Sequence, residues 1–254
     1  MKEYIDKITS GVNDKGVYDI DTVKGCELGL KNNPDGCWGL CYAKKIADRY
    51  GIDFSKSVVR RSESFSQIQK TIKEIKNLPI LFSRIGTMGD PCHAWKQTIS
   101  VCGWLTKTDK DIVIITKHWI KLTDEQMEKL GKLKVIINTS ISALDTEAQR
   151  EYRLKQYNRY KKFGKSILRI VSCKFNEDNL KGKELADIQR GLFKNDLSLD
   201  NPLRVSKSYP MVKQGIIIVE KIKDLNSEIS MSKFNKKTYV GRCDKCPDQC
   251  GITM

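Results

Sequence analysis

The segment DIVIITKHWIKLTDEQMEKLGKLKVIINTSIS (residues 111–142) contains the pattern that decides the fold. Its two short runs rich in Ile and Val, residues 111–119 and 134–142, indicate buried strands. Between them, Thr123 and Gln126 form a capping-box pair that predicts the start of a helix. A strand, a helix and a second strand in this order are typical of a β/α unit, whose two strands lie parallel in one sheet.

The same alternation extends in both directions along the chain. Further strands are predicted at residues 17–24, 78–86, 166–173, 201–209 and 215–222. Helices are predicted at residues 39–50, 64–77, 93–107, 146–163 and 183–193, with Asp145 as the cap of the fourth. We therefore expect an α/β fold, a partial (β/α) barrel of about six parallel strands, with a doubly wound open sheet as the alternative.

Composition bounds the class of protein. The chain has 254 residues, of which 39% are hydrophobic and 30% charged, as in a globular protein. It has no apolar run long enough to cross a membrane, and its first ten residues lack the apolar stretch of a secretory signal. We expect a cytoplasmic protein with no membrane partner, made of a barrel over residues 1–222 and a small Cys-rich extension over residues 223–254.

Nine cysteines in a reducing compartment point to metal or redox chemistry rather than to disulfides. Three of them lie in KGCELGLKNNPDGCWGLCYA (residues 24–43), at the end of the first predicted strand. The residues between Cys26 and Cys37 are turn-formers that suit a loop around a bulky group. Three thiolates hold a [4Fe–4S] cluster and leave one iron open, whereas structural zinc needs a fourth ligand. Iron–sulfur, zinc and ordinary thiols all remain open.

Three more cysteines, Cys243, Cys246 and Cys250, lie within eight residues near the C-terminus. Pro247 and Gly251 beside them favour tight turns. This spacing predicts a second metal site, either iron–sulfur or zinc. Its fourth ligand comes from Cys92, Cys102, Cys173 or His93, or the site stays open; for Cys102, in an apolar helix, a buried thiol is the main interpretation.

Gly36-Cys37 followed by Cys41-Tyr42-Ala43 resembles the G-C-x-x-C-Y-A pattern of atypical radical S-adenosylmethionine (SAM) proteins, which include phage-associated proteins and relatives of spore photoproduct lyase. The usual motif of that superfamily is C-x3-C-x2-C, and this chain departs from it. The resemblance covers about residues 17–175. It implies Cys26, Cys37 and Cys41 as ligands of a [4Fe–4S] cluster that binds SAM and, once reduced by a flavodoxin or ferredoxin, cleaves it to a 5′-deoxyadenosyl radical.

The resemblance also implies roles for residues at other strand ends. The segment GTMGDP (residues 86–91) would approach the amino group of SAM. Other polar side chains would contact the SAM ribose or carboxylate, and Tyr42 or Trp38 would pack on the adenine. The implied cofactor-binding residues are Gly86, Met88, Gly89, Asp90, Asn138, Ser140, Ser142, Arg169 and Tyr42. Candidate catalytic residues, which stand at or just after the ends of predicted strands, are His93, Lys117 and Cys173.

The formal net charge of +15 suits a polyanionic partner such as DNA, RNA or a nucleotide, although lysine enrichment alone explains it equally well. Helix 146–163 combines basic residues with three tyrosines, but a helix packed on a sheet must turn some of these inward. We therefore predict a radical SAM enzyme that acts on a nucleic acid or nucleotide. Its resemblance to relatives of spore photoproduct lyase favours a lyase reaction. The alternatives are a non-catalytic zinc protein that binds nucleic acid, and an iron–sulfur electron carrier.

Overall fold

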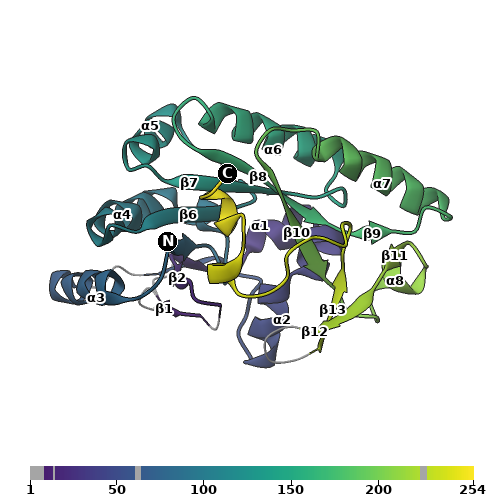
Figure 1. The fold of residues 1–254 in the computed structure, drawn as a ribbon, viewed down its shortest axis with the longest axis horizontal. Helices are drawn as coiled ribbons and strands as arrows, with labels where there is room; N and C mark the ends of the chain where they lie inside the picture. The colour runs from purple at the N-terminus through teal and green to yellow at the C-terminus, as the bar shows by residue number, and fades with distance from the viewer. Residues whose placement is uncertain (1–8, 14, 61–63, 224–227) are drawn as a thin grey trace.

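The computed structural model describes residues 9–13, 15–60, 64–223 and 228–254, with a mixed α/β architecture built on one large sheet (Figure 1). The sheet has nine strands in the order β1-β2-β5-β6-β7-β8-β10-β13-β12. Six of these pair in parallel and follow one another in chain order: β2 (Tyr18–Asp21), β5 (Phe82–Ile85), β6 (Asp111–Thr116), β7 (Ile136–Ile141), β8 (Ser166–Ser172) and β10 (Ser198–Arg204). The order contains no reversal of the kind that defines a doubly wound sheet.

Antiparallel strands border this parallel set on both sides. At one edge β1 (Thr9–Val12) pairs with β2. At the other, β13 (Glu228–Ser232) pairs with β10, and β12 (Glu220–Lys223) pairs with β13. Residues beyond 222 therefore continue the main sheet.

The predicted strand at residues 215–222 is the one that the structure changes most. It divides into β12 and β11 (Ile217–Ile218), and β11 pairs antiparallel with β9 (Lys174–Phe175). Neither piece joins the parallel set. The first predicted strand, residues 17–24, is also divided, into β2 and β3 (Val23–Lys24), because β3 turns away to pair with β4 (Val58–Val59).

Five long helices cover one face of the sheet, as the periodicity predicted. They are α3 (Phe65–Asn77), α4 (Trp95–Leu105), α5 (Asp124–Lys132), α6 (Glu147–Tyr160) and α7 (Leu180–Leu192). Alternate strand residues such as Ile20, Ile114, Ile137 and Ile170 pack against them in two apolar clusters. The capping box of Thr123 is confirmed.

The cap of α6 differs from the prediction, because Thr146 and Gln149 form a second capping box there. The Asp145 carboxylate is directed elsewhere, to cations and to a loop N–H group. Tyr157 and Tyr160 of α6 are buried against the sheet, so only part of this helix's aromatic and basic set is on the surface.

The opposite face of the sheet has a different cover. Its lower part is an apolar layer that packs against the C-terminal residues Cys243, Cys250 and Ile252; the layer consists of Val17, Phe82, Val113, Ile136, Ile167 and Leu199. Figure 1 shows this C-terminal segment, in yellow, lying across the sheet rather than beside it. The short helix α8 (Pro210–Lys213) stands near the far edge, beside β11.

Two helix glycines provide a matched test of the packing between α5 and the turn that follows α6. A Cβ on Gly131 in α5 would lie 2.2 Å from the Phe163 carbonyl oxygen, whereas a Cβ on Gly103 in α4 would meet nothing within 4 Å. Gly103→Ala should stabilise the protein by about 0.5–1 kcal/mol, because alanine is the better helix former. Gly131→Ala should destabilise it despite the same gain, as measured by urea unfolding. Equal effects of the two changes would contradict this packing.

Candidate functional site

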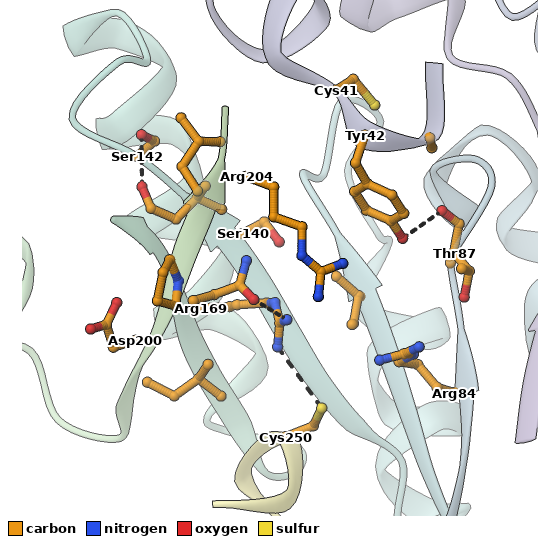
Figure 2. Close-up of a pocket in the computed structure, with 18 of the residues that line it drawn as sticks. Cys41, Tyr42, Arg84, Thr87, Ser140, Ser142, Arg169, Asp200, Arg204 and Cys250 are labelled. Carbon is orange, nitrogen blue, oxygen red and sulfur yellow. Dashed lines mark hydrogen bonds between the residues drawn. The ribbon is translucent and has the colours of Figure 1, made fainter. Parts of the chain in front are cut away.

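A cavity of about 730 Å³ lies on the face of the sheet that carries the C-terminal segment (Figure 2). Its walls come from the first cysteine loop, from the carboxyl ends of β5 to β10 and from residues 235–250. In Figure 2, Cys41 and Tyr42 lie at one side of the cavity and Cys250 at the other, with Ser140, Arg169 and Arg204 between them. Cys26 and Cys41 of the first cysteine group and all three cysteines of the second thus line one space.

The first cysteine loop is tied at its start to the segment after β5. Gly25 has a φ of +80°, and a Cβ there would lie 1.9 Å from the Lys56 carbonyl oxygen, so only glycine fits. Its N–H donates to the Met88 carbonyl (3.0 Å), and it forms a parallel bridge with Gly89. This pairing brings Cys26 next to residues 86–91, which the sequence separates by about sixty positions.

The loop itself is more regular than its turn-forming composition suggested. It contains α1 (Glu27–Asn32), a π-helical turn (Pro34–Trp38) and then α2 (Tyr42–Arg49). Cys26 and Cys41 precede α1 and α2 at the N-cap positions, and both line the cavity. The side chain of Cys37 lies outside the described part of the structure.

Residues 86–91 form a tightly anchored turn. Asp21, at the end of β2, accepts hydrogen bonds from the N–H groups of Thr87 and Met88, both at 2.8 Å. Gly86 has a φ of +105°, and a Cβ there would lie 2.4 Å from the Ile115 carbonyl oxygen. Burial raises the pKa of Asp21, and the two N–H donors oppose that rise. Sequence analysis did not identify Asp21, although it is an acid at a strand end.

The Asp90 carboxylate is occupied by protein donors. It accepts from the Cys92 N–H (3.1 Å), the Thr116 hydroxyl (2.6 Å) and the Lys117 N–H (2.8 Å). Asp90 therefore joins the end of β5 to the end of β6 and fixes the wall that Lys117 continues. His93 lies one turn further on, with its Nε2 3.8 Å from the Cys26 sulfur.

Asp145 is the centre of a second buried network. It pairs with Lys117 (Nζ–Oδ1 3.3 Å) and with the buried Arg153, and it accepts from the Ser142 N–H at 2.8 Å. Asn33 of the cysteine loop donates to the same carboxylate at 3.2 Å. Burial acts to raise the pKa of Asp145, but the two cations outweigh it and hold the pKa below its ordinary value. The carboxylate therefore stays ionised and ties the cysteine loop to the end of β7.

The floor of the cavity is the C-terminal segment. The Asn138 amide donates to the Cys250 carbonyl (2.8 Å), and Lys165 donates to the Ile252 carbonyl (2.8 Å). Gly251 has a φ of +96°, and a Cβ there would lie 2.5 Å from the Ile167 side chain. The close approach of this backbone to β8 explains why the segment can lie flat on the sheet.

Most of the residues predicted from the sequence meet in this cavity. Those that line it are Cys26, Cys41, Tyr42, Gly86, Gly89, Asp90, Lys117, Ser140, Ser142, Arg169, Cys243, Cys246 and Cys250. Met88 packs instead beside Ala47 and Phe54, and Asn138 holds the floor from beneath. Cys173 is fully buried in a separate apolar cluster, where burial raises the pKa of its thiol.

Arg84 is a lining residue that sequence analysis missed. Its guanidinium forms a two-point pair with Asp19, at 2.8 and 3.0 Å, on the cavity face of the sheet. The signal was a charged residue inside an otherwise apolar strand, a position where an arginine needs a partner or a function.

The donor chemistry of the cavity suits a metal that prefers sulfur, because its two cysteine groups supply soft thiolate ligands. Among the side chains that the structure describes, no three His, Cys, Asp or Glu already stand together at a common point that could hold a metal. The grouping of Cys26, Cys37 and Cys41 cannot be judged, since the Cys37 side chain lies outside the described part of the structure.

Within the described residues, no helix is long and apolar enough to cross a membrane.

Comparison of the sequence with models of known protein families finds no match, and comparison with curated proteins finds none either. Function therefore has to be argued from the cavity.

Two aspartates that pair with arginines of α6 test the Asp145 network. Asp145→Asn leaves the buried Arg153 without its counter-charge and should cost about 3 kcal/mol of stability or more. Asp124, the partner of Arg159, is 77% exposed. Asp124→Asn should therefore cost about 1 kcal/mol of stability or less. Chemical denaturation of both variants checks the difference, and a small effect of Asp145→Asn would contradict the network.

His118 provides a test by pH. It is fully buried outside the cavity lining, with its Nε2 3.2 Å from the Thr139 hydroxyl, and burial lowers its pKa to about 4 from an ordinary 6.5. Between pH 6.5 and about pH 4, His118 is protonated in the unfolded chain but neutral in the folded protein. The free energy of unfolding therefore decreases as the pH falls below 6.5. Between about pH 7.5 and about pH 5 the loss should be about 2 kcal/mol. His118→Gln should lack this part of the pH dependence, and an unchanged profile would contradict the assignment.

Proposed function

We propose that this protein is a radical SAM enzyme, with Cys26, Cys37 and Cys41 as the ligands of a [4Fe–4S] cluster. The observation that carries the proposal is the meeting of Cys26 and Cys41 with the turn at residues 86–91, Ser140 and Arg169 around one cavity. These segments are far apart in sequence, and the resemblance to radical SAM proteins assigned all of them to one cofactor site. The proposal includes a partial (β/α) barrel, which the unreversed order of six parallel strands supports.

When bound, such a cluster supplies one electron to SAM, which is cleaved to methionine and a 5′-deoxyadenosyl radical. The protein's own residues would bind the cofactor, orient it and shield it from water. Gly89 keeps the turn close to the cysteine loop, because a Cβ there would lie 2.4 Å from the Val23 carbonyl oxygen. Tyr42 lines the cavity and is held by a hydrogen bond from its hydroxyl to the Thr87 carbonyl (2.9 Å), so its ring is positioned to pack on an adenine.

Hydrogen bonding within the protein narrows the set of residues that would contact SAM. The Asn138 amide and the Ser142 hydroxyl already donate to carbonyl groups, of Cys250 and Val171 respectively. Asp90 is occupied by three donors. We assign the ribose contact to Ser140 and a positioning role to Asp90. We assign the carboxylate contact to Arg169, whose guanidinium has N–H donors beyond the one that bonds to Asn201.

The substrate class that we propose is a nucleic acid or nucleotide, supported by the net charge of +15. Arg169 and Arg204 at the cavity wall add cationic groups where such a substrate would lie. The buried Arg153, Tyr157 and Tyr160 of α6 take no part in it. A base within a duplex would have to be extruded to reach this cavity.

The test is SAM cleavage by the reconstituted protein. Under anaerobic conditions with a reductant and SAM, the protein should produce 5′-deoxyadenosine, measured by chromatography. Cys41→Ala should reduce the product to background because a cluster ligand is lost. Cys102→Ala should retain it, since Cys102 is buried among α4 and the helix-side core.

Single-stranded DNA, duplex DNA and RNA form the second arm of the same experiment. One of them should raise the rate of cleavage and bind with an affinity that falls as salt rises. Protein loaded with iron and sulfide that gives no product under any of these conditions would contradict the radical SAM proposal. Zinc in place of iron would favour a non-catalytic binding protein.

A further inference from the structure

Residues 233–242, with the sequence KFNKKTYVGR, form a basic segment between β13 and the C-terminal cysteines. Four of these ten residues are Lys or Arg, none is Asp or Glu, and Phe234 and Tyr239 stand among them. In Figure 1 the segment belongs to the yellow chain that leaves β13 at the edge of the sheet and runs toward the C-terminal turns. Cations that alternate with aromatic rings are typical of surfaces that bind nucleic acid.

The basic segment is a wall shared by two hollows. Lys237 and Tyr239 line the large cavity. On the other side lies a smaller hollow of about 330 Å³, which is lined by Lys174, Glu220, Ile222, Lys233, Phe234 and Lys236. A ligand that follows the segment would therefore pass from the smaller hollow into the cavity.

The smaller hollow carries more positive than negative charge. Its Lys174 pairs with Glu220 (Nζ–Oε1 2.9 Å), which is the only acid among the described residues that line it. The hydrogen bond and charge of Lys174 lower the pKa of Glu220, and the charges of Lys236 and Lys233 lower it further. Three lysines thus lie near a single carboxylate, so the hollow remains attractive to a phosphate backbone.

Both aromatic rings are held in place and are still accessible. Phe234 stacks on Phe193, with ring centres 5.2 Å apart and planes 12° apart, and it is 37% exposed. Tyr239 is also 37% exposed, and its hydroxyl donates to the Arg242 carbonyl (2.9 Å). Because both rings are already ordered, a base that stacks on either of them loses less free energy to the ordering of side chains.

The backbone between and beyond the rings is anchored to the rest of the protein. The Thr238 hydroxyl donates to the Asp200 carboxylate of β10, which also accepts from the Ser172 hydroxyl at 2.5 Å. At the end of the segment, the Cys243 N–H donates to the Lys15 carbonyl (2.9 Å). The basic segment is therefore a fixed surface rather than a loop that a ligand would have to order.

We propose that the basic segment binds single-stranded nucleic acid. The phosphates contact Lys233, Lys236 and Lys237. The bases stack on Phe234 and Tyr239. This inference deepens the proposed function by locating its substrate, and it rests on that function only for the reaction in the cavity, because binding itself requires no SAM.

The path of the strand explains why a single strand is favoured over a duplex. From the smaller hollow it reaches the cavity, where Arg169 and Arg204 supply further cations. In a duplex the bases are stacked on one another and paired, so none is presented to two separate rings unless it is extruded. An unpaired base meets neither cost.

The test measures the binding of fluorescently labelled single-stranded DNA and RNA of mixed sequence to the anaerobically reconstituted full chain, by anisotropy over a range of salt concentrations. The variant carries Lys233→Gln, Lys236→Gln and Lys237→Gln. If each lysine contacts a phosphate, the slope of log affinity against log salt should fall by about 2. The affinity at physiological salt should fall about tenfold or more.

A second triple variant, Lys70→Gln, Lys73→Gln and Lys129→Gln, is the matched control. These lysines are exposed on α3 and α5, on the helix-covered face, and their removal changes the net charge by the same amount. This control should retain both the affinity and the salt slope. Equal losses in the two triple variants would show that net charge alone attracts the strand, and would overturn the inference.

Stacking is tested without a change of charge. Phe234→Leu should lower the affinity for the single strand about fivefold or more and leave the salt slope unchanged. Phe65→Leu is the control, since Phe65 is 75% exposed at the start of α3, and it should bind like the unaltered protein. An unchanged affinity of Phe234→Leu would overturn the stacking role.

Two competitors identify the partner. Duplex DNA of the same sequence should displace the labelled strand less well than the unlabelled single strand does, and equal or better competition would overturn the preference for a single strand. Polyglutamate should compete poorly. If polyglutamate binds through the same three lysines while nucleic acid does not, the surface serves an acidic protein, and the inference is wrong.

Binding is measured without SAM or a reductant, so the inference and the proposed function fail separately. An affinity that does not depend on the basic segment, in a protein that cleaves SAM, would overturn the inference alone. Binding that does depend on the segment, in an iron-loaded protein that never cleaves SAM, would overturn the radical SAM proposal alone.

Discussion

The cavity depends on how the face of the sheet away from the five long helices is covered. Because the long helices lie on one face, an apolar layer on the other, which includes Phe82, Val113 and Ile167, has to be shielded by a different part of the chain. Burying one side chain of this size stabilises the folded protein by about 1.5–3 kcal/mol, so burial of the whole layer strongly favours the segment that covers it. The cover is the C-terminal segment, and its docking places Cys243 and Cys250 beneath the carboxyl ends of the strands.

The upper wall of the cavity is fixed by a different kind of interaction. Asp21, Asp90 and Asp145 are three buried carboxylates, and each accepts hydrogen bonds from at least one other segment of the chain. Together they tie the cysteine loop and the strand-end turns to one another before any ligand arrives. A rigid wall of this kind lowers the cost of orienting a cofactor, since the groups that contact it need not be ordered on binding.

Local patterns in the sequence predict much of this architecture. The β/α units, the helix predicted at residues 64–77 and the capping box at Thr123 depend on neighbouring residues, and all three are present. The gathering of Ser140, Arg169 and Lys117 at one cavity also follows, because parallel strands end at the same edge.

The predictions that differ from the structure concern segments whose conformation depends on contacts with residues far away in the sequence. The residues between Cys26 and Cys37 predicted a loop of turns around a bulky group, yet the loop forms short helices. Its Asn33 bonds to Asp145, more than a hundred positions away. The strand at residues 215–222 has the expected β propensity, but its partners are β9 and β13 rather than a parallel neighbour. Nor does any local pattern show that residues 243–252 lie against β8, since that depends on the space above Ile167.

The most direct measurement of the central claim is anomalous diffraction at the iron edge from crystals of the anaerobically reconstituted protein. Our account predicts iron density at Cys26, Cys37 and Cys41, facing the cavity between the turn at residues 86–91 and Arg169. Well-ordered crystals of protein shown to contain iron, but with no anomalous density at the first cysteine group, would contradict it.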